Sequence, residues 1–318
     1  MFKRNDMDTL KMTPAQLKQF EAAMNELERY RSLSETEKKH IIDMVMSSTF
    51  MDLRCDWAFK HVMNNPDILK MLLNDVLPEP VDSISHLPNE VDRLFAGDKD
   101  ATMDVVCESG DHKFIVEIQQ KKKEDFKNRM YYYGAAMSKS QLGKSCAYGA
   151  LLPVYVICFM DFRFPHPVDQ LIYRYALREE SSGELYGNQL NIYFCELPRL
   201  RKKSMNGLNP LEGWLYLFKN LHTFAGAPEG MDERFVPVLE AARMNILPDA
   251  DRLKYFRSML TEEEKQDLIV SGYHNGLEDG AEQERIAIAK QMLAEKLEPE
   301  LICRVTGLTP EALAEQQL

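Results

Sequence analysis

The sequence predicts an α/β fold, with helices covering the faces of a central sheet. Residues 101–107 and 114–119 are rich in β-branched and apolar side chains, and the Glu-Ser-Gly-Asp between them is a hairpin turn signal. Residues 153–162 and 190–197 are dense in Val, Ile, Tyr, Phe and Cys and predict buried strands. Segments with helical spacing lie before, between and after these runs, which is the order expected of an α/β core.

The N-terminal part predicts two helices that precede this core. Thr13 is typical of an N-cap with Pro14 at the first helical position, and a second start lies at Ser34, with Glu37 at the capping-box position. We expect residues 1–50 to form a helical extension.

Three further helices follow from apolar spacing. Residues 55–77 predict a helical stretch that is interrupted at 64–66 (Asn-Asn-Pro) and closed at 78–80 (Pro-Glu-Pro). Residues 124–142 and 211–221 have helical spacing as well. Between the two buried strands, the Pro and Gly clusters after residue 164 are typical of loops, so no strand is expected there.

The C-terminal region, residues 223–318, is predicted to be helical and to differ from the rest in charge. Residues 278–296 predict a long helix, and 298–305 and 310–315 predict two short ones around a glycine turn, which resembles half of a helix-turn-helix. Residues 244–318 hold 8 basic against 15 acidic residues, so this segment carries −7 of the net charge of −11. That balance argues for a surface facing protein partners, and the long helix could support a homodimer although it lacks a clean heptad.

Composition limits the class of protein. A chain of 318 residues with 45% hydrophobic residues can bury a full core. The net charge of −11 has the wrong sign for a protein held on DNA by bulk electrostatics. The six cysteines are far apart and form no C-x-x-C pair, as expected of reduced thiols in a cytoplasmic protein. No apolar run is long enough for a signal peptide or a membrane span, so no membrane partner is expected.

Two carboxylates fall on one face of the predicted hairpin. If residues 109 and 110 form the turn, Asp104 opposes Ile115 and lies diagonal to Glu117; if the turn is Gly110-Asp111, Asp104 lies directly opposite Glu117. Like charges side by side on an apolar ribbon are costly unless a cation lies between them. A divalent cation is the simplest candidate, and solvent-facing carboxylates are the alternative.

The residues around this pair resemble the PD-(D/E)XK nuclease family. Asp104, followed after about a dozen residues by Glu117-Ile118-Gln119, is similar to the family signature in the variant that ends in Gln, as in the Rpn-like recombination-promoting nucleases, a group often labelled transposases. Residues 56–60 (Asp-Trp-Ala-Phe-Lys) resemble the upstream D-x-x-F-K helix start of that group. On the next helix, its aromatic, arginine and tyrosine positions are matched by Phe126, Arg129, and Tyr132 or Tyr133.

This resemblance covers residues 50 to 200 and implies a restriction-endonuclease-like core, a mixed sheet flanked by helices, within residues 51–222. It also implies that Asp104, Glu117 and the carbonyl of Ile118 hold Mg²⁺ or Mn²⁺, both of which prefer oxygen ligands. Two positions depart from the family pattern. Met103 replaces the usual proline, and Gln119 replaces the usual lysine, so Gln119 could only orient a water and donate a hydrogen bond.

Other residues keep two interpretations each. Asp56 could be a third acid at the metal, or a first-turn carboxylate paired with Lys60 at i+4. Arg129 could hold a phosphate or a carboxylate, or lie on the surface. Lys121, Lys122 and Lys123 could contact nucleic acid or form a solvated strand end, with Lys121 on the Glu117 face if the strand continues.

Together these features predict a Mg²⁺-dependent endonuclease that hydrolyses DNA, with Asp104, Glu117, Gln119, Asp56 and Arg129 as its catalytic residues. The resemblance implies a role in recombination or in defence against mobile DNA. The alternative is a catalytically inactive nuclease fold that binds a protein partner through its acidic tail.

Overall fold

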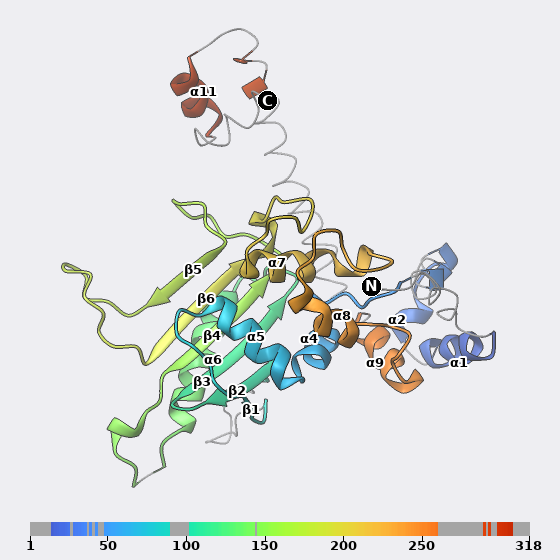
Figure 1. Ribbon diagram of the computed structural model, residues 1–318, viewed down its shortest axis with the longest axis horizontal. Coiled ribbons are helices and arrows are strands. Elements are labelled where there is room, and N and C mark those ends of the chain that lie inside the picture. Colours follow the sequence, from blue (N-terminus) through green and yellow to red (C-terminus); the bar gives the residue numbers. More distant parts are fainter. Residues whose placement is uncertain are drawn as a thin grey trace. The chain divides into compact units, whose positions relative to one another are not determined.

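The structure is a computed structural model that describes residues 14–25, 28–36, 38–39, 42–43, 48–89, 102–143, 145–259, 289–290, 292–293 and 298–307. It divides into two compact units, Met1–Thr261 and Glu262–Leu318. The first unit contains the sheet and its covering helices (Figure 1). Within the described residues, no helix is both long and apolar enough to cross a membrane.

The first unit is built on one mixed, six-stranded sheet with the strand order β1-β2-β3-β4-β6-β5. The strands are β1 (Ser85–His86), β2 (Val105–Ser109), β3 (His112–Gln119), β4 (Val154–Met160), β5 (Ile172–Ala176) and β6 (Leu190–Glu196). β3, β4 and β6 run parallel, and the other pairs are antiparallel. The predicted α/β class with a mixed central sheet is confirmed.

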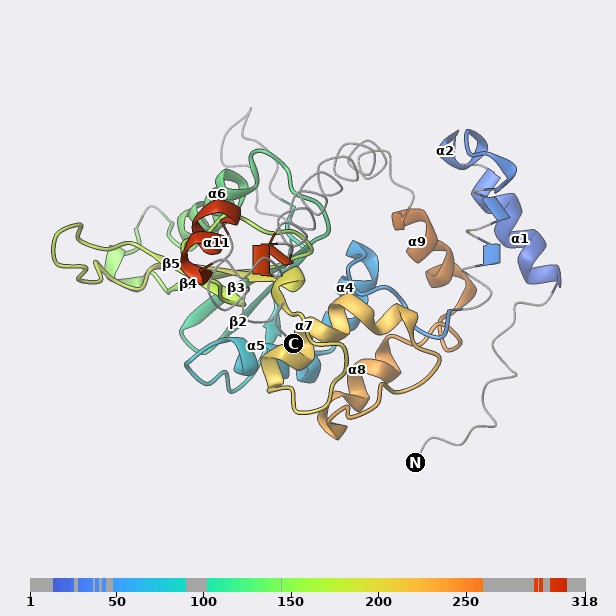
Figure 2. The ribbon, with the colours of Figure 1, turned by 90° about the horizontal axis from the view of Figure 1, so that it is seen from above.

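Helices cover both faces of this sheet (Figure 2). The longer helices of the first unit are α1 (Pro14–Asn25), α4 (Asp56–Met63), α5 (Pro66–Val76), α6 (Phe126–Ser140), α7 (Pro210–Asn220) and α9 (Asp249–Met259), and the second unit contains α11 (Pro299–Thr306). Two short ones are α2 (Glu28–Arg31) and α8 (Val236–Ala241). α6 packs on one face through a core that includes Phe126, Met130 and Val156. α4, α5 and α7 pack on the other face, around Phe59, Phe159 and Phe218.

Local sequence explains where α4 and α5 begin and end. The side chain of Asn65 accepts hydrogen bonds from the amides of Asp67 and Ile68, and Pro66 occupies the first helical position of α5. The predicted break at residues 64–66 is therefore confirmed as the junction between two helices. α7 begins with a complete capping box between Asn209 and Glu212.

Several predicted elements differ from the observed ones. The first strand of the hairpin begins at Val105 instead of residue 101, and the loop expected between the buried strands contains β5, which pairs with β6. The two-residue strand β1 was not predicted either. The predicted helix start at Thr13 lies outside the described residues, and so does Glu37 of the start at Ser34. Most of the predicted helix 278–296 and all of 310–315 also lie outside them. The domain boundaries at residues 50 and 222 stay predictions.

Candidate active site

The hairpin formed by β2 and β3 brings the two predicted acids together. Val105 pairs with Val116 and Ser109 with His112, so the turn is Gly110-Asp111 and Asp104 lies opposite Glu117. Gly110 has a φ of 55°, a left-handed conformation that glycine adopts without steric cost. The alternative register, with the turn at residues 109 and 110, is wrong.

Each acid is hydrogen-bonded to the main chain of the other strand. The amide of Asp104 donates to Oε1 of Glu117 at 2.8 Å, and the amide of Ile118 donates to Oδ2 of Asp104 at 2.9 Å. These bonds take the place of a main-chain ladder beyond Val105, which explains why β2 begins one residue after Asp104. The two carboxylates therefore link the strands at the open end of the hairpin and lie next to each other.

Burial is the main cause of the raised pKa values of both acids. The pKa of Asp104 lies well above its ordinary value because of burial, then the charges of Glu117 and Asp56. Burial raises the pKa of Glu117 to about 7, although the hydrogen bond from the Asp104 amide and the charge of Arg129 oppose the rise. Ionisation of these buried acids is therefore unfavourable unless positive charge lies beside them.

Lys60 supplies one such charge from the first turns of α4. Its Nζ lies 2.7 Å from Oδ1 of Asp56 and 3.2 Å from Oδ1 of Asp104. Burial lowers the pKa of Lys60, but the carboxylates of Asp104 and Asp56 outweigh that effect and the net pKa is raised. The predicted i+4 pair between Asp56 and Lys60 is thus present, and Lys60 connects Asp56 to the central acids.

Gln119 at the end of β3 and Arg129 on α6 are the remaining polar residues of the site. Oε1 of Gln119 accepts a short hydrogen bond from Nη2 of Arg129, which α6 carries over this face of the sheet. The guanidinium also lies 5.6 Å from the ring centroid of Phe126. Tyr133, one α6 turn further on, donates to the carbonyl of Thr102 at 3.1 Å and so ties α6 to the segment before Asp104.

The three lysines after β3 lie in different environments. The strand ends at Gln119, so the condition that would place Lys121 on the Glu117 face is not met. Lys121 is buried, whereas Lys122 is exposed and its Nζ lies 5.3 Å from the ring centroid of Phe164. Lys123 is half-buried. Their predicted contact with nucleic acid stays a prediction.

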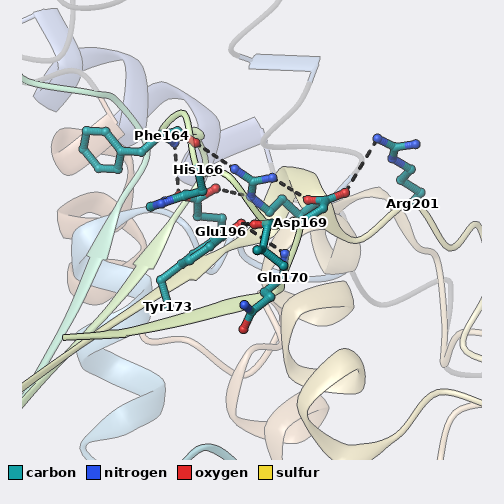
Figure 3. A network of polar contacts seen from close by, with 9 residues as sticks. Phe164, His166, Asp169, Gln170, Tyr173, Glu196 and Arg201 are labelled. Carbon is teal, nitrogen blue, oxygen red and sulfur yellow. Dashed lines mark hydrogen bonds and ion pairs between the residues drawn. The ribbon is translucent and has the colours of Figure 1, made fainter. Parts of the chain in front are cut away.

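Sequence reasoning missed a second polar cluster, on the neighbouring strand end. Glu196, fully buried at the end of β6, accepts a hydrogen bond from the amide of Phe164 at 3.1 Å and lies 3.0 Å from Nε2 of His166. Its other oxygen accepts a short bond from Arg199. Figure 3 shows the cluster. An acid at the end of a strand-like run was the signal available in the sequence.

The residues present fit a hard divalent cation held by few protein ligands. Among the described residues no three His, Cys, Asp or Glu side chains form a complete cage. Asp104 and Glu117 offer carboxylate oxygens at one place, and Mg²⁺ usually keeps several waters and binds through one or two carboxylates. The paired, buried acids define the kind of cation that fits: small, divalent and partly hydrated.

The fold and the site together define a protein of the PD-(D/E)XK class. The sheet is mixed with a parallel centre, and its hairpin carries the two opposed acids Asp104 and Glu117, followed two residues later by the side-chain amide of Gln119. The chain matches the family described as PD-(D/E)XK nuclease family transposase over residues 53–272. The chain belongs to this family. No curated protein and no solved structure matches it significantly.

The tail has a family match of its own. Residues 282–317 match the C-terminal HTH domain of the Rpn/YhgA-like nuclease family. The predicted resemblance to the Rpn-like group is therefore confirmed. The described part of this domain contains α11, which ends at Gly307 with a φ of 70°. A helix-turn-helix favours DNA as the partner of the tail, against the expectation of a protein partner drawn from its acidic balance.

Proposed function

We propose that this protein is a Mg²⁺- or Mn²⁺-dependent endonuclease that hydrolyses phosphodiester bonds in DNA. The observation that carries the proposal is the pair Asp104 and Glu117, buried face to face with raised pKa values at the open end of a hairpin. Membership of a nuclease family and the helix-turn-helix match support DNA as the substrate.

In this proposal Asp104, Glu117 and the Ile118 carbonyl hold the cation. When bound, such a cation would supply an activated water at neutral pH and would stabilise negative charge on the phosphate. Oε1 of Gln119 is engaged by Arg129, so the amide nitrogen of Gln119 is the atom that can donate to a water or to a phosphate oxygen. Arg129 orients Gln119 and adds positive charge beside the site.

Lys60 and Asp56 complete the arrangement. The Lys60 ammonium offsets the repulsion between the acids while it contacts Asp104. Asp56 holds Lys60 by its other side and remains half-exposed, with 47% of its side-chain surface accessible. Asp56 therefore holds Lys60 in place, and its carboxylate also interacts with Asp104.

Plasmid nicking with Mg²⁺ tests the proposal. We expect the wild type to convert supercoiled plasmid to nicked and linear forms, and Asp104→Asn and Glu117→Gln each to lower the rate at least about 100-fold. Glu108→Gln is a matched control, because Glu108 lies on the same hairpin but pairs with Lys113 at 2.7 Å. A wild type that folds and binds DNA but does not cleave it would overturn the proposal and leave an inactive, DNA-binding nuclease fold.

A further inference from the structure

The carboxyl edge of the parallel strands carries a second feature beside the acidic site. Gln119 of β3 is in register with Met160 of β4, and Met160 is in register with Glu196 of β6. The segments that leave these three strands therefore emerge next to one another, at the kind of edge where open α/β sheets bind their ligands.

Two of these segments, those after β3 and β6, are basic although the chain is acidic. Residues 121–129, after β3, contain five basic and two acidic residues. Residues 199–203, after β6, contain four basic residues and no acidic one. The chain as a whole has a net charge of −11, so positive charge is concentrated at this edge.

Direct contacts join the two basic segments. Nζ of Lys122 and Nζ of Lys127 lie 5.3 and 4.5 Å from the ring centroid of Phe164, in the segment after β4. The carbonyl of Phe164 accepts a hydrogen bond from Arg199 at 2.7 Å, and its amide bonds to Glu196. Phe164 therefore lies between Lys122 and Lys127, which follow β3, and Arg199, which follows β6.

The same aromatic group reaches the acidic site. The ring of Phe164 lies 6.1 Å from the ring of Phe126, and Phe126 is the ring beside the guanidinium of Arg129. Arg129 bonds to Gln119. Packed residues thus connect the acids of the hairpin to the basic segment after β6.

Glu196 and Asp169 fix this edge without neutralising all of its charge. Arg199 is bound by both carboxylates. Arg201 is 4.0 Å from Asp169, and half of its side chain is exposed. In Figure 3 the guanidinium of Arg201 lies at the margin of the cluster, away from Glu196. Lys202 and Lys203 are exposed as well.

The main chain of the basic segment is held in place from both sides. Leu200 and Met205 are buried, and the carbonyl of Lys203 accepts a hydrogen bond from the hydroxyl of Tyr216 on α7 at 3.0 Å. The charged side chains of residues 201–203 are therefore presented from an anchored backbone. A fixed row of cations suits a polyanion of regular charge spacing, such as the phosphate backbone of DNA.

We propose that Lys122, Lys127, Arg201, Lys202 and Lys203 form a rim that binds the phosphate backbone of duplex DNA beside the acidic site. This inference rests on the proposed function for its substrate. It adds that the duplex lies across the carboxyl ends of β3, β4 and β6, with the rim acting on phosphates that are not cleaved.

The test is the salt dependence of DNA binding by the full chain in EDTA, where no cleavage is needed. The rim variant is Arg201→Gln/Lys202→Gln/Lys203→Gln. The matched control is Lys18→Gln/Lys70→Gln/Lys254→Gln, whose lysines lie on α1, α5 and α9 and which changes the net charge equally. Both keep the helix-turn-helix, so its contribution cancels in the comparison.

For a 30-base-pair duplex, we expect the slope of log affinity against log salt to be shallower by about 3 in the rim variant, and affinity at low salt to fall about tenfold or more. The control should match the wild type. Equal slopes for the rim variant and the control would overturn the inference, and a change seen only with duplex RNA would overturn its assignment to DNA. If the rim variant binds DNA more weakly but the wild type never nicks plasmid, the proposed nuclease activity is wrong and DNA binding by the rim is supported.

Discussion

The contact between Gln119 and Arg129 determines how a lysine at position 119 would affect stability and activity. Because Arg129 donates to Gln119, the Gln119→Lys variant places an ammonium against a guanidinium inside a half-buried site. We expect this variant to lose about 1–3 kcal/mol of unfolding free energy and to cleave no faster than the wild type. Urea denaturation and plasmid nicking measure the two effects.

A second change checks the cause. Arg129→Gln removes the opposing charge, so Gln119→Lys/Arg129→Gln should recover most of the stability lost in the single Lys variant. A single Lys variant as stable as the wild type would show that the two side chains do not interact as described.

Glu117 makes stability depend on pH in an unusual direction. Its pKa is raised to about 7, so between its ordinary value near 4.5 and pH 7 the folded protein keeps a proton that the unfolded chain releases. The folded state is thus stabilised at low pH, and this contribution is lost as pH rises through 7. Without divalent metal, the free energy of unfolding of Glu117→Gln relative to that of the wild type should increase by up to about 3 kcal/mol between pH 4 and pH 8.

Thermal unfolding of both proteins in EDTA over this range measures the gain. Added Mn²⁺ should raise the melting temperature of the wild type at pH 8 more than that of Glu117→Gln. A constant difference between the two proteins at all pH values would contradict the raised pKa.

Sequence reasoning succeeded at the hairpin because its information is local. Strand alternation and a four-residue turn place Asp104 and Glu117 on one face in either register. The role of Lys60 was only half predicted. Its pair with Asp56 follows helix spacing, but its contact with Asp104 depends on how α4 packs at the sheet, which no local pattern encodes.

At the scale of elements, the packing of α7 depends on the lack of a side chain at Gly213. A Cβ at this position would lie 2.6 and 2.7 Å from two ring atoms of Phe235, and that ring is buried against Trp214. Alanine favours helix by about 1 kcal/mol over glycine, yet we expect Gly213→Ala to destabilise the protein by about 1–3 kcal/mol. Chemical denaturation measures the difference.

Two further variants make this prediction specific. Gly149→Ala is the control, since nothing lies within 4 Å of the Cβ that it would add. Gly213→Ala/Phe235→Leu removes the ring atoms that the new methyl group meets and should recover part of the loss. A Gly213→Ala variant more stable than the wild type would mean that α7 can shift away from Phe235.

The elements that sequence reasoning missed are those that depend on distant partners. β5 is a five-residue edge strand whose register is set by β6 alone, and β1 has two residues beside β2. Neither is long or buried enough for a clear pattern, whereas β4 and β6 are mostly apolar and were recognised. Helices with strong caps, such as α5 and α7, were also placed correctly.

At the scale of the whole molecule, the catalytic proposal and the tail belong to separate compact units. Removing residues 282–317 should leave Mn²⁺ binding and slow cleavage at high enzyme concentration, while DNA affinity falls about tenfold or more, because the helix-turn-helix is lost. Titration calorimetry with Mn²⁺ and DNA binding by fluorescence anisotropy separate the two outcomes. A truncated protein that binds DNA as tightly as the full chain would remove the tail from DNA recognition.

Overall charge misled the interpretation of the tail. A net charge describes bulk attraction, but a helix-turn-helix binds DNA through a few side chains on one helix, and a rim can be basic on an acidic protein. The two short helices around a glycine were the useful signal. Assigning them to a DNA-binding domain required the family match.

The hydrogen bonds at the open end of the hairpin also provide a way to detect cation binding. The amide protons of Asp104 and Ile118 point directly at the carboxylates that would hold the cation. Any ion that draws electron density from those oxygens must weaken both bonds. In a ¹⁵N-labelled sample, these two resonances should move together during a Mg²⁺ titration, so occupancy could be followed without substrate or turnover.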